Sequence, residues 1–89
     1  MHSGSIKVVN KLGLHARAAS KFVTCTTRFD CSIRVRTNNE WVDGKSIMSV
    51  MMLAAGQGTT LHFEMEGPDA EPAFRALEEL LADRFGEDE

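Results

Sequence analysis

The chain has 89 residues, of which 43% are hydrophobic and 26% charged, the composition of one small folded domain spanning residues 1–89. No apolar run approaches the roughly 18 residues of a membrane span, and the first residues lack a signal-peptide pattern. We therefore expect a cytoplasmic protein without membrane insertion. Two cysteines are too few for a disulfide scaffold or a zinc site, and we expect no metal and no cofactor.

Charge is unevenly distributed along the chain. The net charge of −3 argues against general nucleic-acid binding. Residues 1–45 nevertheless carry a balance of +5, and residues 46–89 a balance of −8. Such a division is compatible with two differently solvated faces, or with a local anion site near the basic end of an acidic protein.

The first half of the chain predicts a strand and then a helix. Residues 1–4 are expected to form a flexible leader, and the alternation in residues 5–9 predicts a half-buried strand. From His15 onward the apolar residues recur every three or four positions, which predicts an amphipathic helix over about residues 16–27. Residues 31–36 alternate again and predict a strand with one wet side.

The second half predicts two strands and two helices. A turn at Asn38 and Asn39 is expected to join residues 31–36 to a strand over 40–43. A short helix capped by Ser46 should follow and end at the glycines from Gly56 on. Residues 60–66 predict a strand. A last helix, capped by Asp69, is expected to carry one apolar stripe, and residues 86–89 an acidic tail. The stripe consists of Phe74, Leu77, Leu81 and Phe85.

The element order is therefore β-α-β-β-α-β-α, which belongs to the α+β class. Because three of the four strands alternate, the sheet should be mainly antiparallel, with one face covered and the other in water. We expect an open-faced two-layer sandwich in which three helices cover one face of a four-stranded sheet.

The segment around His15 is the strongest candidate for chemistry. A neutral imidazole is a good nucleophile near pH 7, and a helix start offers unpaired N–H groups and the positive end of the helix dipole to an anion. Arg17 adds a guanidinium that can engage two phosphate oxygens. The sequence thus allows a covalent phosphoryl site. It equally allows a histidine that only caps the helix and an arginine that only faces water.

Two motifs resemble the HPr family of bacterial phosphocarrier proteins, which belong to the phosphoenolpyruvate-dependent phosphotransferase system. They are GLHARAASKFV and, some thirty residues later, GKSIMSVMML. The resemblance implies the HPr-like fold and a phosphoryl group received on Nδ1 of His15 from enzyme I and passed to an enzyme IIA domain. Arg17 would steady the phosphoryl oxygens. Ala18 departs from the commoner proline and returns one N–H donor to the first turn.

The resemblance also implies that Ser46 is a regulatory phosphorylation site for an HPr kinase/phosphorylase. Phosphate there would suit a helix start and add about −2 charge beside the docking face. We expect Ile47, Met48 and Met51 to be partly exposed as an adaptable docking patch. The full set of expected docking residues is Ala16, Ala18, Ser20, Lys21, Lys45, Ile47, Met48 and Met51.

Several alternatives stay open at this stage. The phosphocarrier could feed sugar uptake or a regulatory branch linked to nitrogen status; in either case it is a monomer that works in a multi-protein chain and is not a stand-alone catalyst. A different class is a small nucleic-acid or ligand-binding module that uses Arg34 and Arg36 on the open sheet face, where Trp41 alone offers an aromatic surface.

Overall fold

The strands of the computed structural model, which describes residues 1–38 and 40–89, form one sheet in the order β1-β4-β2-β3. They are β1 (His2–Lys7), β2 (Ser32–Arg36), β3 (Val42–Asp43) and β4 (Thr60–Glu66). Every neighbouring pair is antiparallel, as predicted. The predicted element order is confirmed, although β2 and β3 are shorter than expected. Of the turn expected at Asn38 and Asn39, Asn39 lies outside the described residues.

The start of the chain differs from its prediction. Residues 2–4 belong to β1 and pair with β4, so the expected flexible leader is wrong; the strand ends at Lys7. The ring of His2 lies 4.8 Å from that of Phe74, and a Cβ on Gly4 would come within 2.6 Å of the Phe74 ring. The sequence hides this strand because its first residues are small and polar, and because its contacts come from residues far along the chain.

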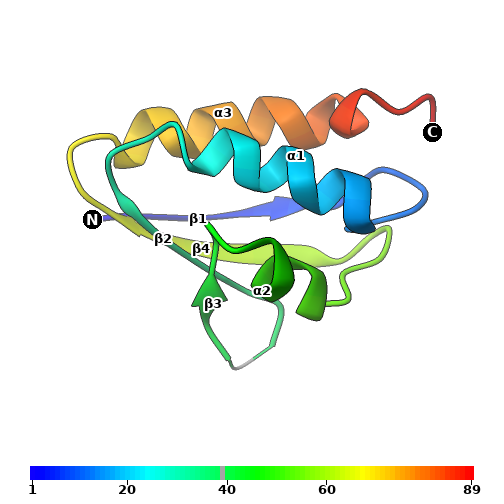
Figure 1. Cartoon of the computed structure of the whole chain (residues 1–89), viewed down its shortest axis with the longest axis horizontal. Coiled ribbons are helices and arrows are strands. Elements are labelled where there is room, and N and C mark those ends of the chain that lie inside the picture. Colours follow the sequence, from blue (N-terminus) through cyan, green and yellow to red (C-terminus); the bar gives the residue numbers. More distant parts are fainter. Residues whose placement is uncertain (39) are drawn as a thin grey trace.

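Three α-helices accompany the sheet: α1 (Ala16–Thr26), α2 (Ile47–Met52) and α3 (Ala70–Ala82). Helices α1 and α3 run side by side over one face, and α2 packs against α1 and β3 (Figure 1). Helix α2 ends before Gly56, because Ala54 already has a positive φ of 51° and leaves the helical conformation. Asp69 precedes α3, but its side chain does not cap it; it accepts a hydrogen bond from the Asp30 N–H instead.

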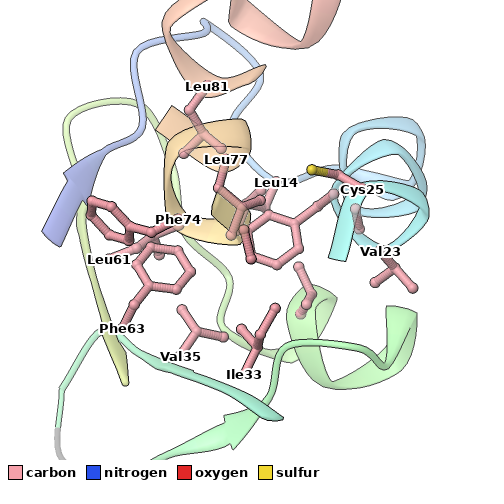
Figure 2. Packing of buried hydrophobic residues seen from close by; sticks show 14 of the residues in the cluster. Leu14, Val23, Cys25, Ile33, Val35, Leu61, Phe63, Phe74, Leu77 and Leu81 are labelled. Carbon is pink, nitrogen blue, oxygen red and sulfur yellow. The ribbon is translucent and has the colours of Figure 1, made fainter. Parts of the chain in front are cut away.

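The core lies between the helices and the covered face of the sheet. Aromatic rings from three elements meet there: Phe22 of α1 is 6.1 Å from Phe63 of β4, which is 5.9 Å from Phe74 of α3. Figure 2 shows Phe63 and Phe74 packed together with Leu77 above them. The predicted stripe is buried, but Phe85 lies in a short 3-10 helix, η1 (Arg84–Gly86), with a φ of 55° rather than in α3. The chain therefore turns after α3 and buries Phe85 separately.

The loop between β1 and α1 is held against the segment that follows α2. The Leu14 N–H donates to the carbonyl oxygen of Ala55 at 2.9 Å. Gly13 has a φ of +67°, and a Cβ there would lie 2.4 Å from the Ala55 oxygen. Glycine is required at this position both by the conformation and by the close approach of the two backbones. This contact fixes where α1 begins, and with it the position of His15.

Candidate functional site

His15 is the N-cap residue of α1 and projects from the start of that helix. Its backbone is extended, and its side chain makes no capping hydrogen bond. The first intrahelical bond runs from the Ala19 N–H to the His15 carbonyl oxygen, so the N–H groups of the three residues between them precede the helical ladder. The side chain keeps 30% of its surface exposed. The alternative in which the imidazole serves only to cap the helix is therefore wrong.

A carboxylate from the other end of the chain contacts this imidazole. Oε2 of Glu87 lies 2.5 Å from Nε2 of His15, across 72 positions of sequence. The chain end marked C lies at the same end of the molecule as the loop between β1 and α1 (Figure 1). The Lys11 N–H also donates to the main-chain oxygen of Glu89 at 2.9 Å. The acidic tail, residues 86–89, is thus part of the site.

Further contacts hold Glu87 in place. The fully buried Asn10 donates from Nδ2 to Oε1 of Glu87 at 3.1 Å and to the Gly13 carbonyl oxygen at 2.9 Å. Nζ of Lys21 donates to the Phe85 carbonyl oxygen at 2.6 Å. Burial by itself would raise the pKa of the Glu87 carboxyl, but the hydrogen bonds from His15 and Asn10 and the charges of His15 and Lys21 lower that pKa below its usual value.

Glu87 is not predictable from the residues near His15, because it lies 72 positions away along the chain. The local signal was an acidic cluster, and such clusters are usually solvated surface. The acidic tail lies beside the start of α1 because Phe85, two residues before Glu87, is buried in the core. Residues 83–89 show no hydrophobic periodicity from which this position of the acidic tail could be predicted.

Arg17 lies on the exposed side of the first turn of α1. Within the part of the chain that the structure describes, its guanidinium forms no ion pair and no side-chain hydrogen bond. An anion bound beside His15 would therefore compete with no internal partner for this group.

Ser46 caps α2, as predicted: its Oγ accepts a hydrogen bond from the Ser49 N–H at 3.3 Å. The neighbouring Lys45 is half-buried, and its Nζ donates to the Phe29 carbonyl oxygen at 2.8 Å. Lys45 is thus tied to the end of the loop after α1, while the Ser46 side chain keeps partial access to solvent.

The expected docking residues differ in their exposure to solvent. Ile47, Met48 and Met51 are 42%, 70% and 39% exposed, which confirms the prediction for α2, and Met52 is exposed as well. Ala16, Ser20 and Lys21 are exposed on α1. Ala18 is completely buried in the core, so its place among the docking residues is wrong. Position 18 faces inward because it lies on the same stripe as Phe22.

The open face of the sheet carries Arg34, Arg36 and Trp41. Both guanidinium groups lie over the Trp41 ring, at 5.3 and 5.0 Å from its centroid. Arg34 also forms an ion pair with Glu64, and Arg36 a hydrogen bond with the Asn38 carbonyl oxygen. These internal partners occupy the groups that a nucleic-acid surface would need to present.

Other kinds of site find no support among residues 1–38 and 40–89. No cluster of three or more His, Cys, Asp or Glu side chains in these ranges could hold a metal ion. None of the described helices is both long and apolar enough to cross a bilayer. Cys25 and Cys31 are free thiols in the core, and burial raises the pKa of Cys31 although Lys45 opposes it.

Comparison with known proteins identifies the family. Residues 2–83 match the family model described as the PTS HPr component phosphorylation site. The chain belongs to the HPr family of phosphocarrier proteins. It is 58% identical over 85 residues to the phosphocarrier protein HPr of Pseudomonas aeruginosa, with 94% of each chain covered, and 48% identical over 85 residues to that of Neisseria meningitidis, with 96% covered.

Solved HPr structures share the fold. The crystal structure of HPr-C-His from Thermoanaerobacter tengcongensis superposes with a TM-score of 0.95 at 40% identity, with both chains completely covered. HPr from Bacillus anthracis gives a TM-score of 0.85 at 38% identity, covering 90% of this chain and 95% of that one. The HPr-like α+β architecture expected from the motifs is thereby confirmed.

Proposed function

We propose that this HPr-family chain carries a phosphoryl group on His15. Nδ1 receives the group from the phosphohistidine of enzyme I and passes it to a histidine of an enzyme IIA domain. The observation that carries the proposal is the imidazole at the start of α1: it is partly exposed, and among the described residues its only side-chain hydrogen bond engages Nε2, not Nδ1. The match of residues 2–83 to a family model described by a phosphorylation site supports phosphorylation of this chain.

The surroundings of His15 suit group transfer between two proteins. The lone pair of Nδ1 attacks phosphorus, the bond from phosphorus to the donor nitrogen breaks, and its electron pair returns to the donor ring. The N–H groups of the first turn of α1, which precede its hydrogen-bond ladder, and the guanidinium of Arg17 supply positive potential for the phosphoryl oxygens. Neither contribution requires a metal bound to this chain.

The docking patch of Ile47, Met48 and Met51 leaves an apolar surface on α2, which the exposed Met52 extends. Methionine side chains adapt to differently shaped partners, so one patch can serve both enzyme I and enzyme IIA. The same transfer chemistry serves sugar uptake and the regulatory branch alike. We propose that the chain acts as a monomer in either.

We also propose that Ser46 is a regulatory phosphorylation site for an HPr kinase/phosphorylase. Its hydroxyl stands at the start of α2, directly before the docking patch. A phosphate there adds about −2 charge beside Ile47 and Met48, which would repel an acidic partner surface without touching His15.

A labelling experiment tests both assignments. The protein is incubated with phosphoenolpyruvate, Mg²⁺ and enzyme I, and intact mass is measured before and after mild acid. We expect an acid-labile gain of one phosphoryl group in the wild type and in Ser46→Ala, and none in His15→Ala. Labelling retained in His15→Ala would contradict the proposal. With the kinase and ATP, an acid-stable gain should appear in the wild type and vanish in Ser46→Ala.

A further inference from the structure

The short contact between Glu87 and His15 determines which ring nitrogen carries a proton. An ionised carboxylate only accepts hydrogen bonds, and the lowered pKa of Glu87 keeps it ionised at neutral pH. Nε2 must therefore be the donor in the 2.5 Å bond to Oε2. In a neutral imidazole the other nitrogen then has the lone pair. This leaves Nδ1 as the nucleophilic atom of His15.

The surrounding residues hold the carboxylate in this orientation. Asn10 directs its amide nitrogen toward Glu87 and the Gly13 carbonyl oxygen, while its Oδ1 is buried without a hydrogen-bond partner among the described residues. If this amide were turned over, Oδ1 would face two acceptor oxygens and both hydrogen bonds would be lost. The two acceptors therefore fix the direction of the amide. Lys21 fixes the backbone at Phe85, two residues before Glu87. Glu87 is therefore anchored from both sides.

We propose that Glu87 is a positioning residue for His15: it holds the Nε2 proton, so that Nδ1 is the atom that accepts the phosphoryl group. This inference rests on the proposed function and adds to it a residue that lies outside both recognised motifs. Its physical basis is the same as that of a carboxylate that orients a histidine in an enzyme or beside a metal.

Glu87 also acts on the charge that forms during transfer. As Nδ1 bonds to phosphorus, the donor ring keeps the electron pair of the broken bond, and the His15 ring becomes a cation because Nε2 retains its proton. The carboxylate touching Nε2 stabilises that cation. When the group leaves for the next histidine, the ring becomes neutral again. No proton needs to leave His15 in either step.

Two measurements on three proteins test this role. Wild type, Glu87→Ala and Asp88→Ala are labelled with ¹⁵N-histidine, and the ring signals of His15 are recorded by NMR at about pH 8, where an ordinary imidazole is neutral. Asp88 is the matched control, because it is an exposed acid on the same tail and, among the described residues, forms no hydrogen bond or ion pair with His15. We expect one tautomer, protonated at Nε2, in wild type and Asp88→Ala, and a mixture in Glu87→Ala. Unchanged ring signals in Glu87→Ala would overturn the proposal.

The second measurement is the single-turnover rate of phosphorylation by enzyme I. Loss of a hydrogen bond to a charged, partly exposed ring should slow Glu87→Ala about fivefold to tenfold, with Asp88→Ala at the wild-type rate. If wild type is labelled and Glu87→Ala is labelled equally fast, the role of Glu87 is overturned and the proposed function stands. If wild type is not labelled at all, the proposed function fails, and the NMR comparison still decides whether Glu87 sets the tautomer.

Discussion

At the scale of single residues, the site depends on a few polar contacts between segments that are distant in sequence. His15 comes from a motif that is visible in the sequence, whereas Asn10 and Glu87 have no recognisable pattern. All three are linked by hydrogen bonds, so a change at one alters the environment of the others. Such linked groups are expected to show non-additive effects when they are mutated together.

The Glu87 contact should make stability depend on pH in one direction. Because the pKa of Glu87 is lower in the folded protein, the contact stabilises the fold above the unfolded carboxyl pKa of about 4.3 and is lost as the pH falls through the lower, folded value. We expect wild type to be more stable than Glu87→Gln at neutral pH and the difference to vanish in acid. His15 and Lys21 are the titratable groups whose charges lower the pKa of this carboxyl.

Urea unfolding of both proteins at several pH values measures this difference. Asp88→Asn serves as the control, since it removes a charge from the same tail without breaking the contact. A wild-type advantage that stays constant into the acid range would show that the ionised carboxylate of Glu87 is not its source.

At the scale of elements, the loop from α2 to β4 shows a local conflict between residue type and conformation. Ala54 is exposed and has a φ of 51°, in the left-handed region that glycine occupies without strain. It ends α2, since the Ala54 N–H bonds back to the Met51 carbonyl oxygen. The glycines that follow at 56 and 58 are therefore not what stops the helix.

Replacing this alanine should stabilise the protein. Ala54→Gly removes the left-handed strain, and we expect the free energy of unfolding to rise by about 0.5–1 kcal/mol. The control is Ala76→Gly, inside α3, which should lower it by about 1 kcal/mol, because glycine is disfavoured in a helix interior. Both values follow from urea unfolding. A destabilised Ala54→Gly protein would mean that the left-handed backbone at position 54 is unstrained.

At the scale of the whole molecule, one buried ring connects the core to the site. Phe85 is only 1% exposed and belongs to η1, whose backbone Lys21 of α1 also holds. Two residues later Glu87 reaches His15. Packing of Phe85 in the core therefore positions Glu87 at the site. Among the described residues, no hydrogen bond joins Phe85 itself to His15.

Phe85→Ala should thus affect both stability and the site. Loss of a buried phenylalanine is expected to cost about 3–5 kcal/mol and to release the tail, shifting the ¹⁵N signals of the His15 ring. Where this variant does not fold, Phe85→Leu should show smaller changes in the same direction. The control is Leu80→Ala, a partly buried position on α3, which should reduce stability but leave His15 unchanged. Unaltered His15 signals in a folded Phe85→Ala protein would contradict the coupling.

The sequence by itself determined the element order, the buried faces of α1, β2 and β4, the capping of α2 by Ser46 and the placement of His15 at the start of a helix. Each of these follows from periodicity or from side chains acting on neighbouring residues, which are local effects. The exposure of Ile47, Met48 and Met51 was also predictable, because the core cannot hold every apolar residue of so short a helix.

Only the tertiary structure decided that residues 2–4 extend β1, that Asp69 bonds to the Asp30 N–H, and that Glu87 holds the His15 ring. Each of these depends on a partner that is distant along the chain. Residue types near each position do not specify such partners. Glu87 reaches the site because the chain turns back after α3. The burial of Phe85 in the core holds the chain in that position.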